Sequence, residues 1–446
     1  MSGITLIRGA LVVNEGRMAE ADVLLRDGRI DRIASEGIGA AKGAVEVDAD
    51  GLWLLPGVID DQVHFREPGL THKDDIAHGS AAAVAGGVTS FMEMPNTRPQ
   101  TLSQDLLEEK YRMGAARSLA NYSFYMGVGS HNLDEVLRTD PRRVCGLKAF
   151  LGSSTGDMVI TDERVLDALF RQAHMLLAVH AEDDPTIEAA LGKALARYGP
   201  DIPITEHPFI RSAEACYRCS SAAVERARAF GTRLHVLHIS TARELALFDP
   251  GPLENKRITA EACVHHLWFD DAAYRTLGPL VKWNPAIKTA ADRDAVRAAV
   301  REGRIDVVAT DHAPHTLEEK AMPYGQCPSG GPLVQHSLVA MLELARQGVF
   351  TVTEVVEKLC HAPARLFNIH GRGYVREGHA ADLVLVDPEA PWTVERAGLV
   401  YKCGWSPFEG QRFHARVLRT WVNGHAAFAD GRVRHEVRGE RLLFDR

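Results

Sequence analysis

The stretches HMLLAVHAE (residues 174–182) and RLHVLHIS (residues 233–240) are apolar runs of strand length, and each contains a histidine near its end. Between them lies a helical pattern, SAEACYRCSSAAVERARAFG (residues 212–231). Short apolar runs bounded by polar loops are typical of buried strands, and strands that alternate with helices form parallel sheets. This segment therefore predicts a parallel βα unit whose strands end in histidines.

The same unit recurs on both sides of this segment. Further strand-like runs, with helical patterns between them, cover residues 54–60, 87–95, 120–128, 145–152, 257–263 and 304–313. With the first two, these runs make eight. Eight strands alternating with helices predict an α/β fold, a (β/α)8 barrel of the TIM type across residues 56–365.

The two ends of the chain have a different pattern. Short alternating strands joined by Asn-Gly and Asp-Gly turns occupy residues 4–34 and again residues 381–433. Such turns are typical of antiparallel hairpins. We expect a small β-sandwich domain built from both termini, residues 1–55 and 366–446.

Composition limits the class of protein. The chain has 446 residues and a net charge of −8, so it has no basic field for nucleic acid or an anionic membrane. Its apolar runs are far shorter than the roughly 20 residues that span a bilayer, and the N-terminus lacks a signal-peptide pattern. Seven scattered cysteines do not suggest a disulfide framework. We expect a cytoplasmic enzyme with a small-molecule substrate, and neither a nucleic-acid nor a membrane partner.

Polar side chains of the kinds that bind metals or anions stand at or just after the ends of the predicted strands. They are His64, Arg66, Asn96, Lys148, His180, His238, Asn284, Asp311 and His315. Any one of them alone is more often a satisfied core or surface residue. The C-terminal ends of barrel strands meet at one face, however, where such barrels carry their active sites. The joint pattern predicts a site of imidazole and carboxylate ligands, which suit zinc or a similar divalent ion.

Nine motifs follow one another along residues 56–410. They are PGVIDDQVHFREPGLTHKDDI, MPNTRP, KAFLGSSTGDM, HAEDD, HIST, HHLWF, NPAIK, ATDHAPHTLEEK and SPFEG. In this order the motifs resemble the dihydroorotases of the amidohydrolase superfamily, and the two flanking β segments resemble that family's small sandwich domain. The resemblance implies reversible cyclisation of N-carbamoyl-L-aspartate to L-dihydroorotate in pyrimidine biosynthesis.

The resemblance also implies a role for each matching residue. His64, His180, His238 and Asp311 correspond to metal ligands, and Lys148 corresponds to the lysine that reacts with CO2 to form a bridging carbamate. Asp311 would also be the general acid and base that moves the proton of the attacking hydroxide to the leaving nitrogen. The remaining matches would form a cradle for the substrate carboxylate. They are Arg66, Asn96, Asn284 and His315.

One ligand of the family pattern is missing. The family reads Asp-x-His-x-His at the first strand, whereas this chain has Gln62 where the first histidine belongs. Strand alternation would put Asp60, Gln62 and His64 on one face and Asp61 on the other, so that Asp60 rather than Asp61 could replace the lost ligand.

The missing histidine affects only one of two metals. The Lys148 carbamate, His180 and His238 would hold one zinc firmly, while a second zinc, at His64, the carbamate and Asp311, would be labile. A further departure lies in the substrate loop, residues 327–336, and no role is assigned there.

Three readings of the function follow. The first is a zinc-dependent dihydroorotase, for which the family suggests a homodimer. The second is a non-catalytic dihydroorotase-like scaffold for aspartate transcarbamoylase, which the loss of a histidine at Gln62 would suit. The third is another cyclic amidohydrolase of the allantoinase or hydantoinase type. Neutral cyclic substrates would not need the Arg66 cradle, which favours the first reading over the third.

Overall fold

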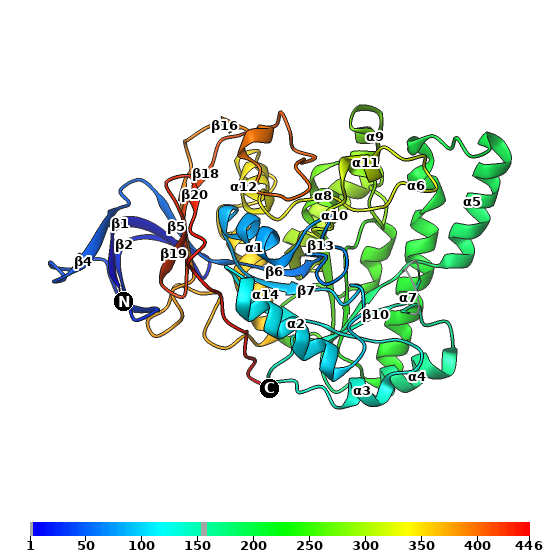
Figure 1. Cartoon of the computed structure of the whole chain (residues 1–446), viewed down its shortest axis with the longest axis horizontal. Helices are drawn as coiled ribbons and strands as arrows, with labels where there is room; N and C mark the ends of the chain where they lie inside the picture. Colours follow the sequence, from blue (N-terminus) through cyan, green and yellow to red (C-terminus); the bar gives the residue numbers. More distant parts are fainter. Residues whose placement is uncertain (1–2, 153–157) are drawn as a thin grey trace.

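The structure is a computed structural model that describes residues 3–152 and 158–446. Figure 1 shows two parts: a β-sheet at one end of the molecule, and a larger body of strands wrapped by helices. Both ends of the chain contribute strands to the sheet. The predicted α/β architecture, a TIM-type barrel with a small β domain, is confirmed.

The eight predicted strand runs form the barrel. Its strands are β6 (Val58–Val63), β7 (Val88–Glu93), β8 (Asn121–Phe124), β9 (Met126–Gly127), β10 (Leu147–Phe150), β11 (Leu177–His180), β12 (Leu234–Val236), β13 (Ile258–Cys263) and β14 (Val307–Ala309). The third run divides into β8, which pairs with β7, and β9, which pairs with β10. All these pairings are parallel, and a parallel bridge between Val63 and His312 joins the last strand to the first.

Helices cover the outside of the barrel. They are α1 (Ile76–Ala85), α2 (Gln104–Arg117), α3 (Leu133–Leu137), α4 (Glu163–Gln172), α5 (Asp184–Tyr198), α6 (His207–Ile210), α7 (Ala213–Phe230), α8 (Val264–Trp268), α9 (Ala273–Thr276), α10 (Ala290–Arg301), α11 (Leu317–Lys320), α12 (Ser337–Arg346), α13 (Val352–Val356) and α14 (Ala362–Phe367). Local sequence sets where they begin and end. In α7, the Ser212 side chain accepts a hydrogen bond from the Ala215 N–H, and Gly231 ends the helix with a φ of 71°.

A nine-stranded sheet joins the two ends of the chain. Its strands are β1 (Ile4–Asn14), β2 (Arg17–Arg26), β3 (Arg29–Ala34), β4 (Ala44–Asp48), β5 (Trp53–Pro56), β15 (Leu383–Asp387), β18 (Arg416–Val422), β19 (His425–Ala429) and β20 (Arg432–Val433). The central junction is between β5, from the N-terminal part, and β15, from the C-terminal part, which run antiparallel. A separate two-stranded pair consists of β16 (Trp392–Thr393) and β17 (Arg412–Phe413). The exact domain boundaries stay a prediction.

The last residues leave the sheet and run along the barrel. Tyr122 N–H donates to the Glu440 carbonyl, and Leu442 N–H donates to the Tyr122 carbonyl, both at 2.9 Å. Leu442 and Phe444 are buried in a core cluster that also contains Tyr125 and Phe367. The C-terminal segment is therefore part of the packing of the barrel.

Within the described residues, no helix combines the length and the apolar character that crossing a membrane requires.

Candidate active site

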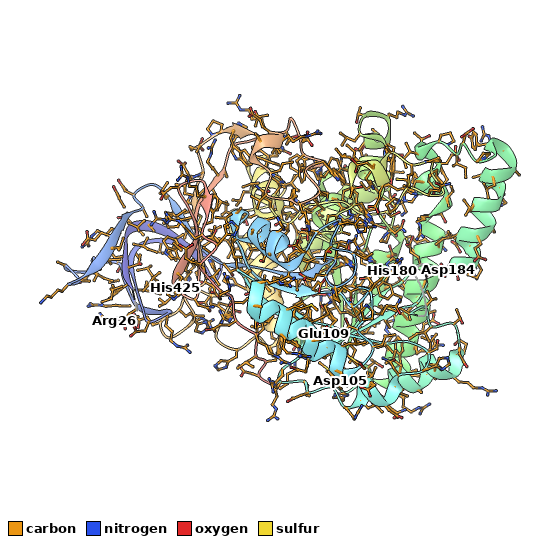
Figure 2. All side chains as sticks on the ribbon, viewed as in Figure 1. Arg26, Asp105, Glu109, His180, Asp184 and His425 are labelled. Atoms are coloured by element: carbon orange, nitrogen blue, oxygen red, sulfur yellow. The ribbon has the colours of Figure 1, made fainter. Side chains whose placement is uncertain are left out.

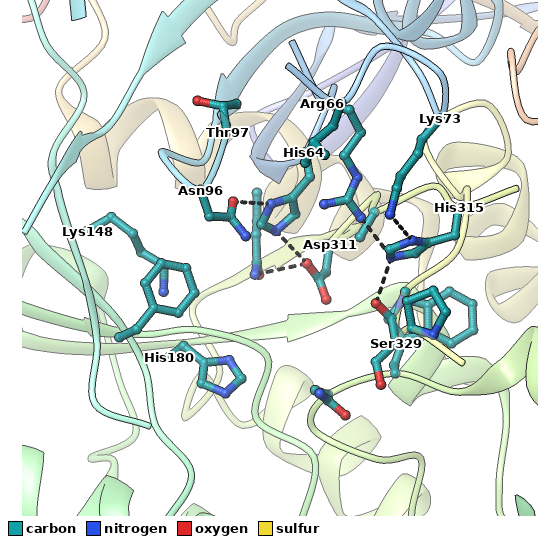
Figure 3. Close-up of a pocket in the computed structure, with 18 of the residues that line it drawn as sticks. His64, Arg66, Lys73, Asn96, Thr97, Lys148, His180, Asp311, His315 and Ser329 are labelled. Carbon is teal, nitrogen blue, oxygen red and sulfur yellow. Dashed lines mark hydrogen bonds and ion pairs between the residues drawn. The ribbon is translucent and has the colours of Figure 1, made fainter. Parts of the chain in front are cut away.

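A cavity of about 570 Å³ is lined by residues from the C-terminal ends of the barrel strands and the loops that follow them. All nine polar residues singled out in the sequence line it: His64, Arg66, Asn96, Lys148, His180, His238, Asn284, Asp311 and His315. Figure 3 shows how most of these side chains converge, and Figure 2 places His180 in the barrel, away from Arg26 and His425 of the terminal sheet. Residues 153–157, part of the KAFLGSSTGDM motif, lie outside the described residues.

Three of the lining residues have an unusual backbone conformation. The φ angles of Arg66, His238 and Asp311 are 65°, 42° and 47°. A side chain with a Cβ is disfavoured in this left-handed region, at a cost of roughly 1–3 kcal/mol per residue, and such residues concentrate at functional sites. The surrounding fold holds these three side chains where local preference alone would not place them.

His180 and His238 form one pair of side chains whose ring nitrogens could bind a metal. His180 Nδ1 lies 2.9 Å from His238 Nε2, and the other ring nitrogen of His180 lies 3.1 Å from a carboxylate oxygen of Glu182. Arg211 holds that carboxylate from the opposite side. Burial raises the pKa of Glu182, but Arg211 and His180 outweigh burial and lower it. Glu182 therefore lies behind the Nε2 side of the His180 ring, and the Nδ1 side faces His238.

His64 and Asp311 form the second pair. His64 Nε2 lies 3.1 Å from Asp311 Oδ1, while His64 Nδ1 lies 2.7 Å from the side-chain oxygen of Asn96. An amide oxygen can only accept, so Nδ1 carries the proton and Nε2 presents its lone pair beside Asp311. Burial lowers the pKa of His64, which favours the neutral ring that metal ligation requires. Asn96 thus orients His64, in addition to any contact it makes with substrate.

Lys148 is a buried amine in the same cavity. Its Nζ lies 4.1 Å from the centre of the Phe150 ring and donates to the Ala149 carbonyl at 3.3 Å. Burial lowers the pKa of Lys148 to about 7, although Asp311 and Glu261 oppose the shift. Near neutral pH a large fraction of this amine is therefore uncharged, which is the form that adds to CO2.

The donor set fits a divalent metal centre. The rings of His64 and His180 and the carboxylate of Asp311 line the cavity, and a polar side chain lies behind each ring, Asn96 behind His64 and Glu182 behind His180. This arrangement of an oriented histidine behind a ligating nitrogen is typical of metal sites. A lysine held partly neutral among these groups is also consistent with an anionic carbamate at this position.

The mouth of the cavity is rich in cations. Arg66 Nε donates to the Pro314 carbonyl at 3.1 Å, and its Nη2 lies 3.1 Å from His315 Nε2. Lys73 Nζ lies 3.0 Å from His315 Nδ1 and also pairs with Glu319. Burial, and then the charge of Arg66, hold the pKa of His315 well below its usual value, so this ring stays neutral. A neutral ring leaves the charge of Arg66 available to an anionic ligand, whereas the charge of Lys73 is already paired with Glu319.

Sequence reasoning did not single out all the polar groups of this mouth. Lys73 and Arg98 also line the cavity, as does Ser329 in the substrate loop, whose carbonyl lies 3.0 Å from His315 Nε2. Lys73 and Arg98 stand in loops a few residues beyond Arg66 and Asn96. A signal was present, because both belong to the loops that follow the first two barrel strands.

The expected alternation along the first barrel strand is wrong. The pairing of β6 with β7 shifts register between Asp60 and Val63, so consecutive residues do not simply alternate there. Asp60 accepts from the Thr310 hydroxyl at 2.6 Å and does not line the cavity, so it does not replace the missing histidine. Gln62 does line the cavity, and its Nε2 donates to Asp311 Oδ1 at 3.3 Å. Asp61 points into the barrel interior, toward His235.

The chain matches a known protein family. The model of the family described as "Amidohydrolase family" matches residues 53–427. A dihydroorotase from Halobacterium salinarum is 36% identical over 398 residues, covering 87% of this chain and 90% of that protein. An allantoinase from Solibacter usitatus is 32% identical over 446 residues, covering 98% and 96%.

Solved structures show the same fold. The L-hydantoinase from Arthrobacter aurescens superposes with a TM-score of 0.93 at 24% identity, covering 99% of this chain and 100% of that one. A dihydropyrimidinase from Brevibacillus agri superposes with a TM-score of 0.89.

Proposed function

The chain belongs to the amidohydrolase family and is a cyclic amidohydrolase, and from this premise we propose that it is a dihydroorotase. The observation that carries the proposal is the cationic mouth built around Arg66. L-Dihydroorotate and N-carbamoyl-L-aspartate carry a carboxylate that a guanidinium can bind through two parallel hydrogen bonds. The ring carbonyl that is attacked would then lie deeper, beside Asp311.

We assign the metal-binding role to the paired donors. His180, His238 and a carboxylated Lys148 would hold one zinc ion, and His64, Asp311 and the same carbamate would hold a second. When bound, such ions polarise a carbonyl and lower the pKa of water from 15.7 to about 7, which supplies hydroxide at neutral pH.

Lys148 would become a ligand only after reaction with CO2. Its neutral amine would add to the carbon of CO2 and release one proton, which converts a neutral side chain into an anionic one with two oxygens. The pKa of about 7 supports this role, because an ammonium does not react with CO2 and would repel a metal ion.

Asp311 would move the proton. In ring opening, its carboxylate would accept a proton from the attacking water and deliver it to the amide nitrogen that leaves. In ring closure the same steps would run in reverse. Gln62 Nε2 donates to Asp311 Oδ1, and this hydrogen bond would hold the carboxylate in place.

Gln62 would make the two metals unequal. Its amide faces Asp311 with the Nε2 donor, which cannot ligate a cation, while the His180–His238 pair is complete. We therefore propose one firmly held zinc and one labile zinc.

A second candidate is allantoinase. The relatives named allantoinase match at 31–32% identity over nearly the whole chain. Allantoin is uncharged at the position where dihydroorotate carries its carboxylate, so an allantoinase would leave the Arg66 fork without its partner. The cationic mouth favours dihydroorotate.

Steady-state assays of the purified protein with L-dihydroorotate, allantoin and an unsubstituted hydantoin test the proposal. We expect the highest kcat/KM with dihydroorotate, and loss of that activity in Asp311→Asn. Asp105→Asn, at the start of α2 and outside the cavity, is the matched control. A higher kcat/KM with allantoin, or no turnover of dihydroorotate by metal-loaded protein, would contradict it.

A further inference from the structure

Three ionisable side chains meet inside the barrel, outside the catalytic cavity. Asp61 on β6, His235 on β12 and Glu261 on β13 are each fully buried, with no exposed surface. None of them lines the cavity described above. Their ligand atoms all lie within 4.8 Å of one another.

The facing atoms of this trio lack hydrogen-bond partners. Among the described residues, both carboxylate oxygens of Asp61, Oε2 of Glu261 and Nε2 of His235 are buried without one. His235 Nε2 lies 3.5 Å from Asp61 Oδ2 and 3.8 Å from Glu261 Oε2. A proton shared between such groups would draw them to about 2.7–2.9 Å. Ligands around a tetrahedral zinc ion, with bonds of about 2.0–2.1 Å, lie roughly 3.3–3.5 Å apart.

The outer atoms of the trio are oriented by the fold. His235 Nδ1 lies 2.8 Å from the Thr259 hydroxyl, which itself donates to the Leu234 carbonyl at 3.2 Å. The hydroxyl therefore accepts from Nδ1, which places a ring proton on Nδ1 and leaves Nε2 facing the two carboxylates. Two buried carboxylates around one ring nitrogen require a positive charge between them, which either a second ring proton or a metal ion would supply, and the separations of 3.5 and 3.8 Å favour the metal ion.

The two carboxylate oxygens of Glu261 also have different surroundings. Its Oε1 accepts from the His238 backbone N–H at 3.1 Å and from the Cys263 thiol at 3.4 Å, whereas Oε2 faces the trio. One oxygen is thus structural and the other is left for a ligand. Asp61 and Glu261 are both fully buried, and two buried carboxylates repel one another unless a cation lies between them.

We propose that Asp61, His235 and Glu261 bind a divalent transition-metal ion, with zinc as the best match, at a structural site inside the barrel that is separate from the catalytic metals. The ion neutralises the two carboxylates and links β6, the first barrel strand, to β12 and β13. The site does not depend on which cyclic amide the enzyme hydrolyses.

Crystals of the full chain grown with zinc test the site directly. An anomalous difference map at the zinc absorption edge should show a peak about 2.0–2.2 Å from Asp61, His235 Nε2 and Glu261 Oε2. Zinc in the catalytic cavity together with no anomalous peak at the trio would overturn the proposal, as would a bound water in its place.

Metal analysis of variants provides a second measurement. Elemental analysis after exhaustive dialysis against a weak chelator should find one zinc per chain fewer in Asp61→Asn and in Glu261→Gln than in the unmodified protein. Asp60→Asn is the matched control, since Asp60 is the adjacent buried aspartate and is hydrogen-bonded to Thr310. Equal zinc content in all four folded proteins, judged by circular dichroism, would overturn the proposal. If the variants do not fold, the anomalous map of the unmodified protein decides.

Discussion

At the scale of single residues, the cavity depends on a few side chains held in disfavoured conformations. Arg66 combines a φ of 65° with a buried guanidinium that the Pro314 carbonyl and His315 surround. Those contacts fix the plane of the guanidinium group, and a guanidinium fixed in advance loses less conformational entropy when it binds a carboxylate.

Arg66→Lys tests the fork. Lysine keeps the charge but cannot form two parallel hydrogen bonds, so kcat/KM for L-dihydroorotate should fall about 10- to 100-fold, the equivalent of roughly 1.5–3 kcal/mol. Steady-state kinetics measure the change, and Arg138→Lys, on an exposed arginine outside the cavity, is the control. An unchanged kcat/KM would exclude the carboxylate-binding role.

Lys148 makes carbamate formation depend on pH. In metal-free protein with fixed dissolved ¹³CO2, the initial rate should rise about tenfold between pH 6 and pH 8 and level off above the pKa of about 7. The sign follows from the amine, which is protonated and unreactive below that pKa and neutral above it. The ¹³C NMR signal of the carbamate reports the rate, and Lys148→Ala should lack the signal. A rate that climbs steadily to pH 10 would indicate an ordinary, unshifted lysine.

Gln62→His should strengthen the labile metal site. An imidazole beside His64 and Asp311 supplies the ligand that the amide does not, so the metal content of the cavity should move from nearer one toward two per chain. Elemental analysis after dialysis against a weak chelator measures it, with the two proteins compared in an Asp61→Asn background so that zinc at the inner trio does not enter the count. Two tightly held cavity metals already present with Gln62 would contradict this prediction.

At the scale of elements, a buried ion pair fastens helix α2 to strand β7. Lys110 Nζ lies 2.5 Å from a carboxylate oxygen of Glu93 and donates to the Met94 carbonyl at 3.1 Å, and both side chains are buried. Such a pair is weak evidence of net stability, but it is costly to break on one side only.

Lys110→Met should therefore destabilise the protein by about 3–5 kcal/mol, because Glu93 would remain buried without its partner. Glu93→Leu combined with Lys110→Met should recover much of that loss. Urea unfolding followed by circular dichroism gives both values. A double variant as unstable as the single one would mean that packing, rather than the unpaired carboxylate, accounts for the loss.

At the scale of the whole molecule, the end of the chain stabilises the barrel. Phe444 is 3% exposed, whereas its neighbour Leu443 is 52% exposed. Phe444→Ala should reduce the free energy of unfolding by about 3–5 kcal/mol, since it removes a buried ring from the cluster around Tyr125 and Phe367. Leu443→Ala should change it by less than about 0.5 kcal/mol. Equal, small effects in urea unfolding would show that the terminal segment does not contribute to the core.

The sequence predicts the architecture well because the barrel repeats one pattern eight times, and apolar runs of that length have few other uses. It also predicts which polar residues gather, since strand ends of a closed barrel meet at one face. It does not predict the register shift after Asp60, which redirects Asp61, because a bulge depends on pairing with β7 rather than on local composition. The sequence also does not predict that Lys73 and Arg98 line the cavity, because residues in loops follow no periodic pattern.

The junction of β5 with β15 has a consequence for synthesis on the ribosome. Residues 56 and 383, at the facing ends of these strands, are 327 positions apart. At about 5–20 residues per second, β5 emerges roughly 15 to 65 seconds before its partner is translated. During that interval the edge of the N-terminal strands is unpaired and open to association with other nascent chains. Production of this protein should therefore depend on chaperones that shield this edge until translation nears its end.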